Sequence, residues 1–231
     1  MNAQPINAIF FDVDFTLIYP GPTFQGEGYA RFCARHGISV NESRFAHAVR
    51  AASSILDEAQ EHVYDGEIFV RYTGRIIQEM GGTGPAVADC AREIYDEWAE
   101  NQHFFLYDDV EPVLRELAGR GLKLGLISNS HRPLESFQEH FELDGLIAAA
   151  VSSSEHGYMK PHPSIFTAAL TLAGVQASES MMVGDSLSHD IDGARRVGMR
   201  GVLVHRSDDP APQTDVPIIR SMSELPGLLL T

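Results

Sequence analysis

The sequence has few cysteines and no long apolar run. Its 231 residues include two cysteines, Cys33 and Cys90, which are too few for a disulfide framework and whose spacing suggests no metal finger. We expect both to be buried free thiols in a reducing compartment. No apolar stretch approaches the roughly 18 residues that a membrane span needs, and the N-terminus lacks the basic segment of a signal peptide. The sequence therefore predicts a cytoplasmic protein with no membrane partner.

Basic residues are also scarce. The chain has 17 Lys and Arg against 32 Asp and Glu, which gives a formal net charge of -15. A surface of this sign repels the phosphate backbone, so we expect no nucleic-acid partner. It repels anionic substrates as well, so an enzyme acting on them needs a local source of positive charge. With 44% hydrophobic and 21% charged residues, the composition is that of a soluble globular protein.

Short apolar runs alternate with helical patterns in the C-terminal half. The expected strands are 8–13, 123–128, 147–152, 181–184, 201–204 and 218–219. Helices are expected at 108–121, 132–141, 163–173, 190–197 and 221–230, the last opened by the capping pair Ser221 and Glu224. Alternating strands and helices form parallel sheets with helices on both faces. The predicted fold class is therefore α/β, with a doubly wound parallel sheet.

A different pattern occupies the stretch from about residue 28 to 103. It shows helical periodicity almost throughout, with Asn41 and Asp65 as expected N-caps and Gly37 and Gly81 as expected helix ends. We predict a helical domain inserted after the first strand. Residues 1–19 and 105–231 then form an α/β core domain, and residues 20–104 form an inserted α-helical cap domain.

Polar residues follow several of the predicted strands. They are Asp12 and Asp14 after the first strand, Ser128 and Asn129 after the second, Asp185 and Asp190 after the strand 181–184, and Lys160 in the loop before the helix 163–173. Taken singly, each has an ordinary explanation as a turn former, a helix cap or a solvated lysine. Ligands of open parallel sheets bind at the carboxyl ends of the strands. Carboxylates gathered there repel one another unless a cation and a lysine neutralise them.

This set of residue types fits phosphoryl transfer. Clustered carboxylates without a His or Cys ligand set favour a hard, oxygen-binding ion, and Mg²⁺ is the expected cofactor. A carboxylate acts as a covalent nucleophile in such reactions and forms an aspartyl-phosphate. A second acid two residues along the chain donates a proton to the leaving group, while a serine hydroxyl, backbone amides and a lysine stabilise the phosphoryl oxygens.

Four motifs in order resemble those of the haloacid dehalogenase (HAD) superfamily. They are Asp12-Val13-Asp14-Phe15-Thr16-Leu17, then Ser128, then Lys160-Pro161, then Gly184-Asp185-Ser186 through Asp190. The resemblance covers essentially the whole chain, and it is to the subfamily with a helical, C1-type cap inserted after the first motif.

The resemblance implies a role for each motif residue. Asp12 is implied as the nucleophile and Asp14 as the general acid and base. Asp12, the Asp14 carbonyl and Asp185 are implied as the Mg²⁺ ligands. The implied phosphate-binding residues are Ser128, Asn129 and Lys160, with Ser128 and Lys160 also counted as catalytic. Asp190 is implied to orient Lys160 or metal-bound water.

Two positions depart from the family pattern. Phe15 stands where glycine is common, so we expect its ring to narrow the pocket or to contact the cap. His189 stands where asparagine is common, and we expect little effect from it. Beside the second motif, His131 and Arg132 either line the pocket or only lead into the helix expected at Pro133.

The resemblance leaves the reaction open between several classes. A 2-haloacid dehalogenase of this superfamily needs neither metal nor an acid at the position of Asp14. A phosphonate-cleaving enzyme needs a cap lysine, and residues 21–102 contain none. A sugar-phosphate mutase uses the same residues as a phosphatase. A non-catalytic binding protein is expected to have lost Asp12, Asp14 or Lys160.

Asp14 favours phosphate ester chemistry, because an alkoxide leaving group needs a proton. We therefore predict an enzyme, a HAD-like hydrolase that acts as a Mg²⁺-dependent phosphatase. Its expected partner is a small phosphorylated metabolite, and its expected state is a monomer or homodimer.

Overall fold

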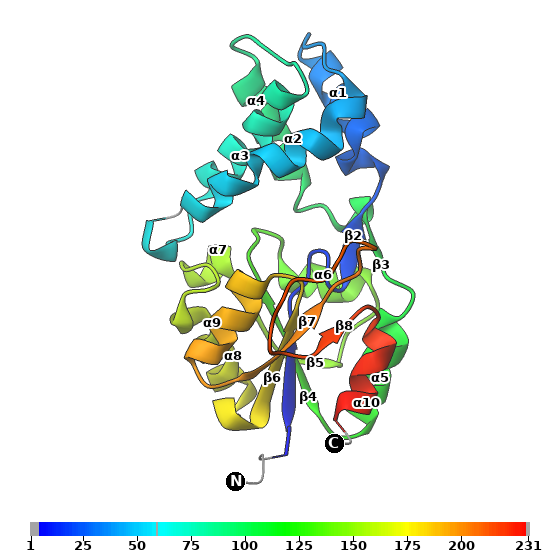
Figure 1. Cartoon of the computed structure of the whole chain (residues 1–231), viewed down its shortest axis with the longest axis vertical. Helices are drawn as coiled ribbons and strands as arrows, with labels where there is room; N and C mark the ends of the chain where they lie inside the picture. The colour runs from blue at the N-terminus through cyan, green and yellow to red at the C-terminus, as the bar shows by residue number, and fades with distance from the viewer. Residues whose placement is uncertain (1–4, 59, 230–231) are drawn as a thin grey trace. The chain divides into compact units, whose positions relative to one another are not determined.

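The computed structural model describes residues 5–58 and 60–229. The chain divides into two compact units, one formed by Met1–Tyr19 with Leu106–Thr231 and the other by Pro20–Phe105 (Figure 1). We call them the α/β unit and the helical unit. That the first is a catalytic core and the second its cap remains a prediction.

A six-stranded sheet runs through the α/β unit. Its order is β5-β4-β1-β6-β7-β8, and every neighbouring pair is parallel. The strands are β1 (Ala8–Phe11), β4 (Lys123–Ser128), β5 (Ile147–Ser152), β6 (Ser180–Gly184), β7 (Arg200–Val204) and β8 (Ile218–Ile219). β1 lies between β4 and β6 and is buried along its whole length, so it is apolar on both faces.

Helices cover both faces of this sheet, which confirms the predicted fold class. In Figure 1, α8 (Pro163–Ala173) and α9 (Asp192–Arg196) lie on one side, and α5 (Val110–Gly119) and α10 (Leu225–Leu228) lie on the other. The short helices α6 (Leu134–His140) and α7 (Ser153–His156) follow β4 and β5. Phe10 of β1 belongs to the core cluster that also contains Phe166 and Ala169 of α8.

The helical unit contains the α-helices expected from the periodicity. They are α1 (Gly26–Arg35), α2 (Phe45–Ala52), α3 (Gly66–Glu79) and α4 (Val87–Glu97), with 3-10 turns at Pro22–Phe24, Glu42–Arg44, Ser53–Glu58, Gln60–His62 and Asn101–His103. The Asp65 side chain accepts a hydrogen bond from the backbone N–H of Glu67 and so caps α3. Cys33 and Cys90 are buried free thiols, as predicted.

Two short strands were not expected from the sequence. β2 (Ile18–Pro20) and β3 (Phe104–Leu106) pair with each other where the chain leaves and re-enters the α/β unit. They escape prediction because three-residue strands carry too little alternation to be distinguished from loops.

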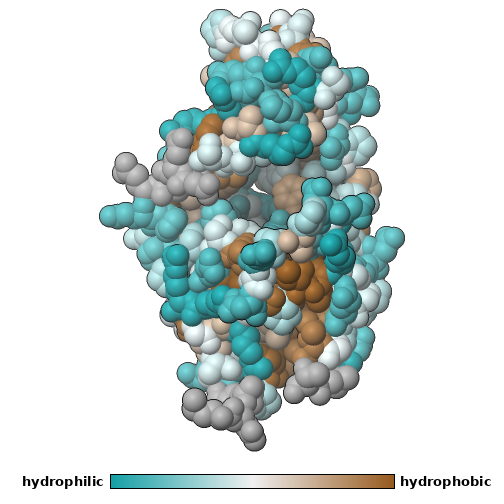
Figure 2. All heavy atoms as spheres, viewed as in Figure 1, coloured by the Kyte–Doolittle hydropathy of each residue, from teal (hydrophilic) through white to brown (hydrophobic). Residues whose placement is uncertain are grey.

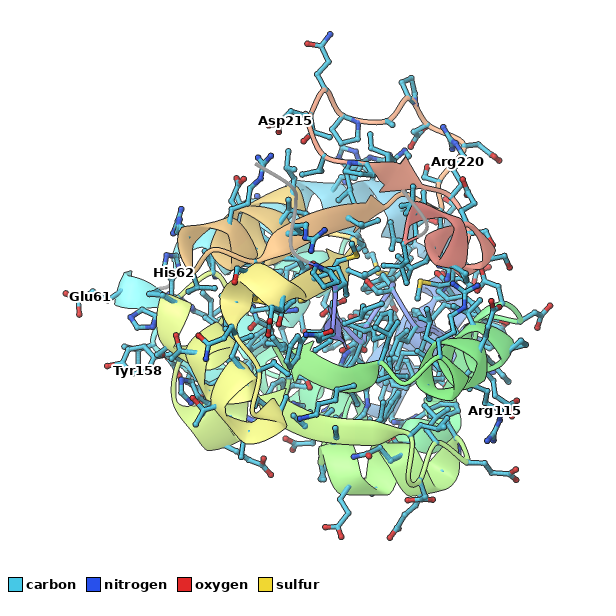
Figure 3. The ribbon with its side chains drawn as sticks, turned by 90° about the horizontal axis from the view of Figure 1, so that it is seen from below. Glu61, His62, Arg115, Tyr158, Asp215 and Arg220 are labelled. Carbon is cyan, nitrogen blue, oxygen red and sulfur yellow. The ribbon has the colours of Figure 1, made fainter. Side chains whose placement is uncertain are left out.

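The C-terminal segment matches the sequence pattern in part. Ser221 and Glu224 form the expected capping box, which opens a 3-10 turn at Met222–Glu224 that leads into α10. Of the expected helix 221–230, residue 230 lies outside the described residues. The loop 207–217 is a surface connection, from which Asp215 projects outward (Figure 3).

Hydrophilic side chains dominate the visible surface, with apolar atoms showing between them on the α/β unit (Figure 2). Within residues 5–58 and 60–229, no helix has both the length and the apolar character to cross a membrane.

Packing against β1 leaves no room for a side chain at Gly125 of β4. A Cβ atom there lies 2.4 Å from a ring carbon of the fully buried Phe10. We predict that Gly125→Ala lowers the free energy of unfolding by about 1–3 kcal/mol, because overpacking forces neighbours to shift. Gly119 is the matched control, since it ends α5 where an added Cβ atom would meet no neighbouring side chain within 4 Å. Gly119→Ala should raise stability by about 0.5–1 kcal/mol. Urea denaturation of both variants checks this, and equal effects contradict it.

Candidate active site

The predicted site residues gather at the carboxyl edge of the sheet. Asp12 and Asp14 follow β1, Ser128 ends β4, and Asp185 follows β6, which are strands that neighbour one another in the order β4-β1-β6. Lys160 lies in the loop between α7 and α8. Parallel pairing thus brings residues from distant parts of the sequence to one edge of the sheet.

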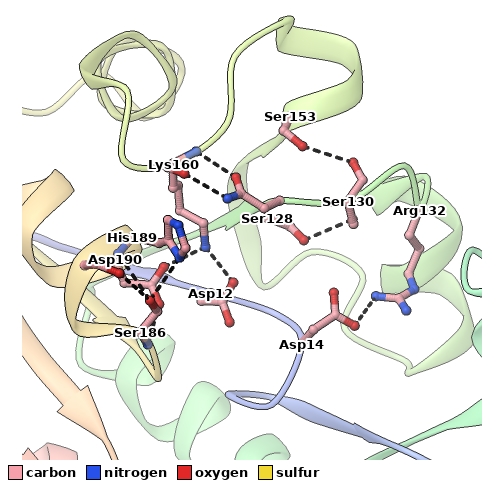
Figure 4. A network of polar contacts seen from close by, with 12 residues as sticks. Asp12, Asp14, Ser128, Ser130, Arg132, Ser153, Lys160, Ser186, His189 and Asp190 are labelled. Carbon is pink, nitrogen blue, oxygen red and sulfur yellow. Dashed lines mark hydrogen bonds and ion pairs between the residues drawn. The ribbon is translucent and has the colours of Figure 1, made fainter. Parts of the chain in front are cut away.

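Lys160 stands at the centre of the group. Its Nζ donates to Asp12 Oδ1 at 2.6 Å and to Asp190 Oδ1 at 2.7 Å (Figure 4). The side chains of Lys160 and Asp190 are 2% and 1% exposed, and that of Asp12 is 10% exposed. Short, charge-assisted hydrogen bonds of this kind offset the cost of burying the charges.

The protonation of these groups reflects a balance between burial and charge. Burial, together with the negative charges of Asp190 and Asp14, outweighs Lys160 and raises the pKa of Asp12 to about 7. Burial lowers the pKa of Lys160, but the charges of Asp12 and Asp190 outweigh it and raise that pKa above its usual value. Lys160 therefore stays protonated at neutral pH, while negative charge is in excess around it.

A third carboxylate adds to this excess. Asp185 is exposed at the edge, and one carboxylate oxygen each from Asp12, Asp185 and Asp190 lie within 4.8 Å of one another. Desolvation by the surrounding protein and the charges of Asp12 and Asp190 raise the pKa of Asp185. Oxygen-only donors with unbalanced negative charge fit a hard divalent cation, and Asp185 is open to solvent from which such an ion would enter.

Asp190 is fixed by its own loop. Its Oδ2 accepts a hydrogen bond from the backbone N–H of Ser186 at 2.9 Å, so one oxygen faces the loop and the other faces Lys160. A Cβ at Gly184 would lie 2.3 Å from Asp190 Oδ2, so glycine is needed before Asp185 for this approach. Residues Leu187–Ile191 form a π-helix, a distortion frequent at functional sites.

Asn129 makes a contact that the sequence did not indicate. Its side-chain amide donates to the Lys160 carbonyl at 3.0 Å and accepts from the Lys160 backbone N–H at 2.7 Å. Both ends of the amide therefore hold the backbone of Lys160, which fixes the start of the lysine side chain. The expected contact of Asn129 with phosphate remains a prediction.

Ser128 is fully buried, and its hydroxyl donates to Ser130 Oγ at 3.0 Å. A hydroxyl proton rotates to suit its acceptor, so this contact leaves the predicted phosphate-binding role open.

Asp14 is separate from the Lys160 group. Its Oδ1 accepts from Arg132 Nη1 at 3.0 Å, and Arg132 is fully buried (Figure 4). From the sequence, Arg132 was expected either to line the pocket or to precede the helix at Pro133. In the structure it forms an ion pair with Asp14. The two residues are 118 positions apart, so no local signal pairs them.

The turn after Asp14 is held in an unusual backbone conformation. Phe15 has φ of 65°, in the left-handed region that favours glycine, and its side chain is 46% exposed. The turn persists because Phe15 N–H bonds to the Ile18 carbonyl, and Arg206 donates to the Thr16 carbonyl while pairing with Asp109. This left-handed φ is a backbone conformation that glycine adopts easily, which explains why glycine is common at this position in the resembled family.

Comparison with known proteins shows a family match over most of the chain. The family model described as haloacid dehalogenase-like hydrolase matches residues 6–198. The haloacid dehalogenase-like hydrolase domain-containing protein 3 of Danio rerio is 29% identical, with 97% of each chain covered. The N-acylneuraminate-9-phosphatase of Mus musculus is 30% identical, with 99% of this chain and 96% of the relative covered. The crystal structure of a 2-haloacid dehalogenase from Pseudomonas syringae has a TM-score of 0.64 and 25% identity, with 97% of this chain and 98% of that chain covered.

The raised pKa of Asp12 predicts a pH-dependent stability of the metal-free protein. The folded protein keeps a proton on Asp12 up to about pH 7, whereas the unfolded chain loses it near the ordinary aspartate value of 3.8. The free energy of unfolding therefore decreases as pH rises from about 4 to about 7, because over this range the unfolded chain releases the Asp12 proton and the folded protein still holds it. Asp12→Asn is nearly isosteric with the protonated acid. In EDTA, we expect its Tm to match that of the wild type near pH 4 and to exceed it by roughly 5 °C at pH 8.

Asp144→Asn, at an exposed carboxyl away from the sheet edge, is the control for generic charge effects. Thermal melts at both pH values check the prediction, and a Tm difference that does not grow with pH contradicts it.

Proposed function

The chain belongs to the haloacid dehalogenase-like hydrolases, and on this basis we propose that it is a Mg²⁺-dependent phosphatase of small phosphomonoesters that works through an aspartyl-phosphate. The observation that carries the proposal is the arrangement around Lys160. One buried cation is shared by Asp12 and Asp190, Asp185 adds a third carboxylate, and Asp14 stands apart with its own partner.

In the first half of the reaction, Asp12 is the nucleophile. An oxygen of its carboxylate attacks phosphorus, the O–P bond forms, and the bond from phosphorus to the ester oxygen breaks. Asp14 gives its proton to the departing oxygen, which leaves as an alcohol. Lys160 donates to Asp12, and in this scheme its charge stabilises the negative charge that develops on the phosphoryl oxygens.

In the second half, water attacks phosphorus and the bond to Asp12 breaks. The Asp14 carboxylate takes the proton that water loses, so the acid of the first step is restored. Phosphate leaves, and the net change is the hydrolysis of one ester bond by one water molecule.

The carboxylates also account for the cofactor. Asp12, Asp185 and the Asp14 carbonyl would hold Mg²⁺, and Asp190 would serve by orienting Lys160. When bound, Mg²⁺ supplies positive charge to the phosphoryl oxygens and relieves the repulsion between Asp12 and Asp185. The pKa values of both acids, raised by burial and by negative neighbours, support a cation at this place.

Dehalogenation is the main alternative, given the similarity to a 2-haloacid dehalogenase. In dehalogenation, halide leaves without a proton and no metal is required. That reaction would therefore use neither the acid at Asp14 nor the three-carboxylate cluster. Mutase activity uses the same residues and differs only in the acceptor of the phosphoryl group. A non-catalytic role is disfavoured because Asp12, Asp14 and Lys160 are all present.

The substrate class follows from the relatives. They include an N-acylneuraminate-9-phosphatase and, over 61% of this chain, a phosphoserine phosphatase of Thermus thermophilus. We propose a small phosphorylated metabolite as substrate. Cytoplasmic location and the state of monomer or homodimer remain predictions.

A panel of phosphorylated metabolites, assayed with Mg²⁺ and with EDTA, tests the reaction. We expect phosphate release that depends on Mg²⁺ and no halide release from 2-chloropropionate. Asp12→Asn should reduce turnover at least about 10³-fold, because it removes the nucleophilic oxygen while preserving shape. Halide release without metal, or activity of Asp12→Asn within tenfold of the wild type, overturns the proposal.

Lys160 should be the main protein cation of the reaction. Lys160→Met keeps the aliphatic stem, and we expect kcat/KM to fall about 10²-fold or more. Lys160→Arg should restore little, because a planar fork on a longer stem misplaces the charge.

Asn129→Ala tests whether the backbone clamp acts through that lysine. Alone, Asn129→Ala should lower kcat/KM about tenfold. In a Lys160→Met background it should lower kcat/KM less than about twofold, as expected for coupled residues. Circular dichroism confirms folding. A folded Lys160→Met enzyme that loses less than fivefold makes Lys160 an ordinary loop residue.

A further inference from the structure

Arg132 is a buried charge to which the catalytic scheme assigns no role. It is fully buried and has the largest volume of the fully buried side chains among the residues that the structure describes. It lies in the loop between β4 and α6, in the segment that begins with Ser128 and Asn129. Placing a guanidinium away from water is unfavourable, and a buried ion pair offsets this only in good geometry. Such a group is a candidate for function rather than for stability.

The contact between Arg132 and Asp14 is made to one oxygen of the acid. Nη1 donates to Asp14 Oδ1 at 3.0 Å, and Asp14 remains 18% exposed while Arg132 has no exposed surface. Solvent therefore reaches the carboxyl group of Asp14 but not the guanidinium. Figure 4 shows Arg132 reaching Asp14 through one of its two carboxyl oxygens.

The two buried cations of this edge serve different acids. Lys160 contacts Asp12 and Asp190, whereas Arg132 contacts Asp14. A planar guanidinium held by packing restricts the rotation of a carboxylate more than a flexible ammonium does. Its positive charge, held 3.0 Å from Asp14 Oδ1, stabilises a carboxylate that has just lost a proton.

We propose that Arg132 is a positioning residue that orients the carboxyl group of Asp14 toward the leaving oxygen of the substrate. The inference rests on the proposed function. When the ester bond breaks, a proton on the Asp14 oxygen that does not accept from Arg132 Nη1 passes to the leaving oxygen, and the electron pair of that O–H bond stays on Asp14. Arg132 holds the resulting carboxylate in place until it takes a proton from the attacking water.

Leaving-group dependence separates this role from a structural one. Arg132→Met removes the charge and keeps the stem. We expect kcat for an alkyl phosphate to fall about tenfold more than kcat for p-nitrophenyl phosphate, because nitrophenolate leaves without a proton. KM for both substrates should change little, since Arg132 does not touch the substrate. For Arg132→Lys, we expect kcat for the alkyl phosphate to fall about threefold more than kcat for p-nitrophenyl phosphate.

The double variant with Asp14→Asn gives the decisive comparison. If Arg132 acts through Asp14, adding Arg132→Met to Asp14→Asn should lower kcat less than about twofold for either substrate. Arg120→Met is the matched control, since Arg120 sits at the end of α5 with partners Glu116 and Pro226 and should leave both rates unchanged. Thermal melts identify variants that fail to fold, and in that case Arg132→Lys carries the test.

Equal losses on both substrates, or a full further loss in the Asp14→Asn background, overturn the inference. The proposed function fails separately. Its acid role for Asp14 is wrong if Asp14→Asn itself shows no preference between the two leaving groups, whereas the inference alone is wrong if Asp14→Asn discriminates and the folded Arg132 variants do not.

Discussion

The site depends on one buried ammonium group shared by two buried carboxylates. Lys160 Nζ lies within 2.7 Å of both Asp12 and Asp190, and all three side chains are at most one-tenth exposed. Neither acid tolerates this depth alone, and the lysine does not either. The surrounding contacts follow from the need to keep this group together. Asn129 holds the backbone of Lys160, Ser186 holds the far oxygen of Asp190, and glycine at position 184 leaves room for that carboxylate.

A shared cation of this kind still leaves the edge short of positive charge. Asp12 and Asp185 both have raised pKa values, so the folded chain retains a tendency to take up protons there. The protein thus holds an electrostatic imbalance that a bound cation corrects, and stability is given up in exchange for binding capacity. The overall charge of -15 makes this local compensation more important, because the field of the whole chain repels an anion.

Much of the architecture was predictable, and the residues show why. The run of Ala8 to Phe11 is apolar at every position, which marks a strand buried on both faces, and parallel pairing then brings strand ends to one edge. Asp65 and the Ser221–Glu224 pair act as caps because their signals are local. The acids were found because they follow strands.

The pairings within the site were not predictable. Asn129 meets the backbone of Lys160, and Arg132 meets Asp14, across 31 and 118 positions of sequence. A single sequence records the residue type but not the rotamer or the partner. β2 and β3 were missed for the opposite reason, since they are too short to show a period.

The order of the strands also has a consequence for how the chain acquires its fold. β1 leaves the ribosome well before its sheet neighbours, which begin at Lys123 and Ser180. Between them the chain produces the whole of Pro20–Phe105, a continuous segment whose contacts are local and which needs no strand from the sheet. The apolar strand that leads to Asp12 therefore has no sheet neighbour until the chain reaches Lys123, and its second neighbour is made only from Ser180 on.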